Sequence, residues 1–166
     1  MSNDLLYSVK RKTNLMTEKI GPCLWRLTQS MPWVILHPKG ISEDIIVPKG
    51  FVSDGASAPQ ISYSICPPMG GAHGESSVLH DYLYSLDCEY ECTRKEADDI
   101  FFFAMIGDGV SPHTASLIYS GVRLGGKSSF RKCFSIERVT EETTERKVYE
   151  DYLKTTTGGV RRGGDH

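Results

Sequence analysis

The sequence lacks any apolar run long enough to cross a lipid bilayer. Its longest such run covers residues 100–106, whereas a membrane-spanning helix needs about 20 apolar residues. The N-terminus also lacks the charged start and following apolar stretch that are typical of a signal peptide. We therefore expect no transmembrane segment and synthesis in the cytoplasm.

An excess of positive charge is missing as well. The chain has 19 Lys and Arg residues against 21 Asp and Glu residues, for a net charge of -2. A general nucleic-acid binder needs a clear cationic excess to neutralise phosphates, so the composition argues against that class. A local basic patch stays open, because Arg and Lys residues gather between residues 123 and 138.

Metal-binding cysteine pairs are absent too. The five cysteines form no Cys-x-x-Cys pair, which argues against a zinc ribbon. Cys88 and Cys92 flank a predicted loop and could form a local disulfide in an oxidising compartment, whereas thiols are expected in a reducing one. The spacing is compatible with both states.

What is present in the first third of the chain is a set of short β-type runs. Residues 1–21 show no clear period, and we expect a partly ordered N-terminal arm there. Beyond them, runs of branched and aromatic residues separated by turn residues predict a small antiparallel sheet of three to five strands. These runs cover residues 24–27, 33–36, 45–47 and 51–52.

Helical signals follow. Apolar residues at three- and four-residue spacing predict a helix over about 75–86. Thr93 and Glu96 form a capping box at the start of a second helix, and Ser111 followed by proline starts a third. The predicted fold is α+β: a small N-terminal antiparallel sheet packed on a three-helix part. We divide the chain into an arm (1–21), a single domain (22–127) and a flexible C-terminal extension (128–166).

A histidine and an aspartate on the first two helices are the main functional candidates. In an antiparallel hairpin around a loop at residues 87–92, His80 and Asp98 lie at similar depth, since each residue adds ~1.5 Å of rise. Tyr84, one turn after His80, can join their hydrogen-bonded network. A carboxylate that orients an imidazole leaves the second ring nitrogen to take a proton from water. A buried structural hydrogen bond with no chemistry is the alternative.

Four more residues are candidates for binding. Asp81 and Asp54 carry carboxylates that could hold a divalent cation, although Asp54 could instead close an Asx-turn. Arg94, in the first turn of its helix, could bind an anionic substrate or pair with a carboxylate. Ser57 could contact substrate or serve as a turn residue; no Gly-x-Ser-x-Gly elbow surrounds it.

Three blocks of sequence occur in an order that resembles a known family. They are GFVSDGASAP at 50–59, LHDYLY at 79–84 and RKEAD at 94–98. This pattern is similar to a family of small phage and prophage proteins known as a domain of unknown function. The resemblance covers about residues 24–126 and implies a viral origin without an assigned reaction.

A shorter resemblance is to phospholipase A2. Those enzymes carry His-Asp-x-x-Tyr on one helix and an aspartate on its partner, which His80, Asp81, Tyr84 and Asp98 match in order. The resemblance implies that the histidine activates water and that the following aspartate binds calcium. The cysteine framework of those enzymes is missing here.

The first functional hypothesis is a phage-encoded hydrolase that acts on lipid or cell-envelope material. The second is a non-enzymatic virion component, such as a tail, baseplate or neck protein, that binds other virion proteins or itself. An inhibitor of a host defence system is the third. Each implies synthesis in the host cytoplasm, and the second implies incorporation into the virion.

Overall fold

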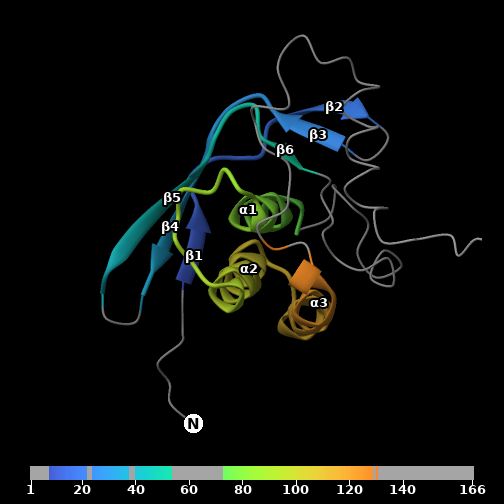
Figure 1. The fold of residues 1–166 in the computed structure, drawn as a ribbon. Coiled ribbons are helices and arrows are strands. Elements are labelled where there is room, and N and C mark those ends of the chain that lie inside the picture. Colours follow the sequence, from blue (N-terminus) through green and yellow to red (C-terminus); the bar gives the residue numbers. More distant parts are fainter. Residues whose placement is uncertain (1–7, 22–23, 38–39, 54–72, 129, 131–166) are drawn as a thin grey trace, which may run out of the picture.

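The computed structural model describes residues 8–21, 24–37, 40–53, 73–128 and 130. In these ranges the strands come first and the helices follow (Figure 1). This order confirms the predicted α+β class.

The strands form two antiparallel sheets of three strands each. The first sheet has the order β1-β4-β5, with bounds Ser8–Arg11, Met31–Leu36 and Ser42–Val47. The second has the order β2-β3-β6, with bounds Thr17–Gly21, Leu24–Leu27 and Val52–Ser53. Strands β4 and β5 pair along their full length, from Met31 opposite Val47 to Leu36 opposite Ser42. Along the chain, β1 is therefore in the first sheet, β2 and β3 in the second, β4 and β5 in the first and β6 in the second.

The helices begin where the sequence predicts. They are α1 (Gly74–Tyr84), α2 (Arg94–Gly107) and α3 (Pro112–Gly125), followed by the short 3-10 helix η2 (Gly126–Ser128). The capping box of Thr93 and Glu96 is present, with both reciprocal hydrogen bonds. The Ser111 side chain accepts from the Thr114 amide, as an N-cap residue should.

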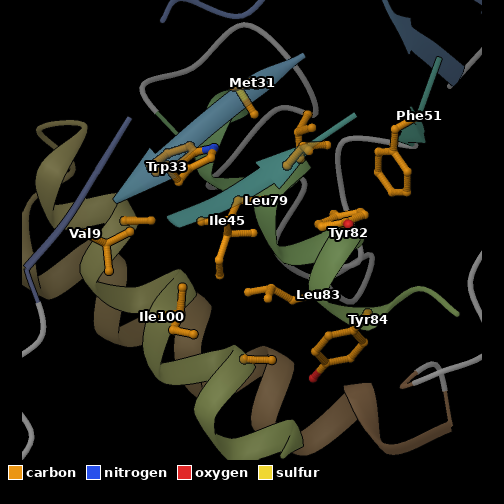
Figure 2. Close-up of a cluster of buried hydrophobic side chains, with 14 of the residues drawn as sticks. Val9, Met31, Trp33, Ile45, Phe51, Leu79, Tyr82, Leu83, Tyr84 and Ile100 are labelled. Carbon is orange, nitrogen blue, oxygen red and sulfur yellow. The ribbon is translucent and has the colours of Figure 1, made fainter. Parts of the chain in front are cut away.

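The main core lies between the first sheet and the first two helices. Met31, Trp33 and Ile35 alternate with half-buried neighbours along β4, as one face of a strand requires. These side chains pack on Leu79 of α1 and Ile100 of α2 (Figure 2). A large buried apolar contact of this kind stabilises the chain by ~1.5–3 kcal/mol per side chain and holds both helices on the sheet.

Helix α2 is the centre of the helical part. It packs on β1 and α1 on one side and on α3 on the other (Figure 1). Phe101 and Met105 of α2 form a second apolar cluster with Ala115, Ile118 and Val122 of α3. The rotation of α3 about its own axis is therefore set by this cluster.

Three expectations need correction. Within the predicted N-terminal arm (1–21), the structure has strands β1 and β2. No period is visible in the sequence there, because each strand is short and buries a single apolar side chain, Val9 in β1 and Ile20 in β2. The expected single sheet is two sheets. The first helix, predicted to run to about residue 86, ends at Tyr84, and Leu86 beyond its end is 62% exposed.

Other expectations fall partly outside what is described. Asp54, Ser57 and nearly all of the predicted C-terminal extension (128–166) lie outside the described residues. Cys88 and Cys92 are both half-buried, and whether they form a disulfide stays a prediction.

Candidate functional site

The side chain of Asp98 is the centre of a buried polar cluster. It is 0% exposed, and three side chains bind it. His80 Nε2 lies 2.9 Å from Oδ1, and the Tyr84 hydroxyl donates to the same oxygen over 2.6 Å. Arg123 Nη1 donates to Oδ2 over 2.6 Å. The structure thus brings together the three residues predicted as catalytic, His80, Asp98 and Tyr84.

The members of the cluster come from three helices: His80 and Tyr84 from α1, Asp98 from α2 and Arg123 from α3. His80 and Tyr84 are one turn apart on α1 and face the same way. Figure 2 shows Tyr84 at the edge of the apolar core, with its hydroxyl oxygen directed away from that core. The His80 ring stacks on Phe101 of α2, with centroids 4.4 Å apart. The imidazole is therefore held by ring contacts as well as by its hydrogen bond.

Opposing effects set the protonation of Asp98. Burial alone would raise the pKa of this carboxyl, but the hydrogen bonds from His80, Tyr84 and Arg123 outweigh burial and hold the pKa below its ordinary value. Burial, and then the adjacent carboxylate, raise the pKa of the Tyr84 phenol. Asp98 is thus a carboxylate and Tyr84 a neutral donor at neutral pH.

This charge state determines which nitrogen of His80 carries the proton. An ionised carboxylate only accepts hydrogen bonds, so Nε2 of a neutral His80 is the N–H donor to Asp98. Nδ1 is then the basic nitrogen of the ring. His80 itself is 2% exposed, so any chemistry at this ring takes place in a dry environment.

The neighbouring aspartate has a different partner. Asp81 is 4% exposed and accepts a hydrogen bond of 2.5 Å from Ser53 Oγ at the end of β6. Within the described part of the chain, no group of three or more His, Cys, Asp or Glu side chains is arranged to hold a metal ion. Asp54 lies outside the described residues, so the pairing of Asp81 with Asp54 as metal ligands stays a prediction.

Arg94 contacts the main chain of the third helix. Its Nη1 donates to the Arg123 carbonyl over 3.1 Å, which satisfies one of the carbonyls left open in the last turn of α3. Its predicted contact with an anionic substrate stays a prediction.

Sequence reasoning missed Arg123 as a partner of Asp98 and considered it only as part of a basic patch. A signal did exist: Tyr119 and Arg123 are four residues apart on the third helix, opposite the adjacent Asp98 and Asp99. The Tyr119 hydroxyl donates to Asp99 Oδ1 over 2.8 Å, and Lys95 pairs with Asp99 Oδ2 over 2.6 Å. Helices α2 and α3 are thus joined by two polar contacts, that of Arg123 with Asp98 and that of Tyr119 with Asp99.

A second polar cluster, also missed, lies at the other end of α2. Asp108 accepts from Arg11 Nε over 2.8 Å and from Ser76 Oγ over 2.5 Å. It borders an open cleft of about 510 Å³ lined by residues 10–14, 107 and 108. Because Asp108 binds both β1 and α1, this cluster ties the N-terminal strand to the helices.

Comparison with known proteins identifies the family of this chain. The model of a family described as "Protein of unknown function (DUF1353)" matches residues 25–122. The chain belongs to this family. The DUF1353 match includes His80, Tyr84 and Asp98 and stops one residue before Arg123.

A curated relative is similar over part of its length. The uncharacterized protein y4jT of Sinorhizobium fredii is 37% identical over 82 residues, which cover 48% of this chain and 23% of that protein. The chain therefore matches less than a quarter of the relative's length. No solved structure matches. None of the described helices is long and apolar enough to cross a membrane.

Proposed function

We propose that this DUF1353 protein is a phage-encoded hydrolase in which His80 is the general base and Asp98 orients it. The 2.9 Å contact between His80 Nε2 and Asp98 Oδ1 carries the proposal. A carboxylate held ionised by three donors fixes the tautomer of the imidazole and makes Nδ1 the basic nitrogen, to which we assign the proton taken from water.

The chemistry follows from this arrangement. A water molecule that loses a proton to Nδ1 attacks the substrate carbonyl, and the imidazolium that forms is stabilised by Asp98. The tetrahedral intermediate then breaks its bond to the leaving alcohol or amine, which takes the proton from the imidazolium, so that His80 returns to its neutral form. The Tyr84 hydroxyl donates to the same oxygen and so helps to fix the position of the carboxylate. We propose an ester or amide bond of lipid or cell-envelope material as the target, because the His-Asp-x-x-Tyr order is similar to that of phospholipase A2.

The test is the substitution His80→Gln, because a glutamine amide can still donate to Asp98. We expect hydrolysis of phospholipid vesicles or of purified bacterial envelopes to fall by at least about 100-fold, the usual contribution of a general base, with little change in melting temperature. The matched control is His113→Gln at an exposed position of α3, which should keep full activity.

The burial of His80 and Asp98 also favours a second candidate, a virion component in which the hydrogen bond between them only stabilises the fold. His80 is 2% exposed and Asp98 0%, as for a histidine that only fills a core. In this case His80→Gln lowers the melting temperature, the wild-type protein hydrolyses neither substrate, and mass spectrometry finds the chain in purified phage particles. The partners would then be other virion proteins or further copies of this chain.

A further inference from the structure

We propose that the outer face of the first sheet is a dimerisation surface, on which a second copy of this chain packs about a two-fold axis that runs along β4. The outer face is the face of β1, β4 and β5 that is turned away from α1 and α2 (Figure 1). This inference does not depend on the chemistry proposed at His80, because none of the residues of the outer face belongs to that site.

The residues of the outer face follow from the alternation of side chains along a strand. Val9, Trp33 and Ile45 are buried in the core, so the residues before and after each of them point outward. The strand register, extended by the hydrogen bond from the Lys12 amide to the Pro32 carbonyl, places these outward side chains in three rows across the sheet. The first row is Ser8, Leu36 and Ser42, the second is Lys10, Val34 and Asp44, and the third is Lys12, Pro32 and Ile46.

The middle of the outer face is apolar. All three outward residues of β4 are apolar, namely Pro32, Val34 and Leu36, and Ile46 of β5 lies beside Pro32. Leu36 is 42% exposed and Ile46 is 55% exposed. The face of an antiparallel sheet that meets only water is typically polar, whereas an exposed apolar patch with a polar rim marks an interaction site. The outer face therefore has the composition of an interface.

The charges on the two outer strands indicate which partner fits. In the second row, Lys10 of β1 and Asp44 of β5 lie on opposite sides of Val34. A two-fold axis along β4 places β1 of each copy over β5 of the other, so that Lys10 of each copy faces Asp44 of the other. A two-fold axis across the strands would instead place Lys10 over Lys10, and this like-charge contact is repulsive. The outer face is therefore complementary to itself in one orientation.

Both charged groups are available for this contact. Lys10 is exposed, and within the described ranges its ammonium group takes part in no hydrogen bond or ion pair. The Asp44 side chain is 53% exposed, and Lys12 donates to its Oδ2 over 2.9 Å, so a second donor can bind Oδ1. Because exposed ion pairs contribute little to affinity, these charges fix the orientation of the two copies and the apolar residues of β4 supply the attraction.

The size of the outer face determines how strong the dimer is. Three strands about 4.8 Å apart, each contributing five residues of about 3.4 Å, give a footprint of roughly 240 Å² per copy. Such a dimer falls below the ~1,200 Å² that separates weak interfaces from those of standard size. We therefore expect monomer and dimer in exchange, with a dissociation constant on the order of 10–100 µM.

The test is sedimentation velocity of the full chain from about 5 to 500 µM, with two charge-reversal variants, Lys10→Glu and Asp44→Lys. The wild type should change from monomer to dimer over this range. In either variant alone, like charges face each other at two places in the dimer, and the dissociation constant should rise at least about tenfold. An equimolar mixture of the two variants has opposite charges at both places and should form a dimer within about threefold of the wild-type affinity.

A third variant tests the apolar part of the surface. Ile46→Thr keeps a β-branched side chain on the strand but removes apolar contact area, so the dissociation constant should rise at least about fivefold. The matched control is Leu124→Thr at an 88% exposed position of α3, and the control for charge reversal is Lys127→Glu at an exposed position of η2. Both controls should dimerise as the wild type does.

A wild-type chain that sediments as a monomer at every concentration would overturn the inference. A dimer that Leu124→Thr weakens and Ile46→Thr does not would overturn it as well, because the contact would then lie on α3. So would a mixture of the two charge variants that stays monomeric while the wild type dimerises. If circular dichroism shows that a charge variant does not fold, the comparison of Ile46→Thr with Leu124→Thr decides.

Discussion

Replacement of Asp98 by asparagine is the most informative single perturbation of the buried cluster. Asparagine has nearly the same shape, so the change removes charge and one acceptor with little change in volume. If its carbonyl oxygen faces His80 and Tyr84, its amide group must face the Arg123 donor. Two donors then meet where a carboxylate oxygen accepted a 2.6 Å hydrogen bond.

The cost can be worked from these contacts. A hydrogen bond to a charged group contributes about 1.5–3 kcal/mol, and loss of one partner from a buried ion pair costs about 3–5 kcal/mol. Arg123 is 30% exposed, so water can replace part of what it loses, and we place the cost near the lower end, at about 3 kcal/mol. For a chain of this length, that cost corresponds to a melting temperature lower by roughly 6–12 °C.

The assay is urea and thermal unfolding at pH 7, with Asp44→Asn as the matched control. Asp44 is 53% exposed and pairs with Lys12, so its removal should cost no more than about 1 kcal/mol. If Asp98→Asn unfolds within about 1 kcal/mol of the wild type, less than the charge-assisted bond alone should cost, our account of the cluster is wrong.

The same variant carries a pH signature. The folded pKa of Asp98 lies below its unfolded value, so its stabilisation is fully present above the unfolded pKa of about 3.9 and is lost as the pH falls through the folded pKa. The stability difference between wild type and Asp98→Asn should therefore shrink on acidification from pH 7 to pH 3. A difference that stays constant or grows would contradict the lowered pKa.

Three further predictions concern neighbouring contacts. Tyr84→Phe removes the hydroxyl that donates to the buried carboxylate; the free energy of unfolding in urea should fall by about 1.5–3 kcal/mol, and an unchanged value would contradict the contact. Gly107→Ala would place a Cβ atom 2.5 Å from the Val9 carbonyl oxygen, so calorimetry should show a destabilisation of about 1–3 kcal/mol, and a more stable variant would show that α2 does not approach β1 this closely. Burial, and then Asp99, raise the pKa of Tyr119 to about 12; its phenol should stabilise the fold below pH ~10 and lose that effect as the pH rises through the folded pKa, and an ultraviolet titration in which Asp99→Asn leaves the Tyr119 pKa unchanged would contradict the assignment.

Local chemistry made much of this structure predictable. The starts of α2 and α3 follow from capping side chains within three residues of each helix, at Thr93 and Ser111. The meeting of His80 and Asp98 follows from helical rise and one short loop. Where a contact depends on neighbours along the chain or on one hairpin, the sequence by itself determined it.

The contacts between distant segments were decided only by the tertiary structure. Strand β1 exists because it pairs with β4, about 25 positions further on, and Arg11 reaches Asp108 across 97 positions. Arg123 reaches Asp98 because the apolar cluster between α2 and α3 sets the rotation of the third helix. Periodicity tells which face of a helix is apolar, but packing against another element decides which polar residue beside that face meets a given partner.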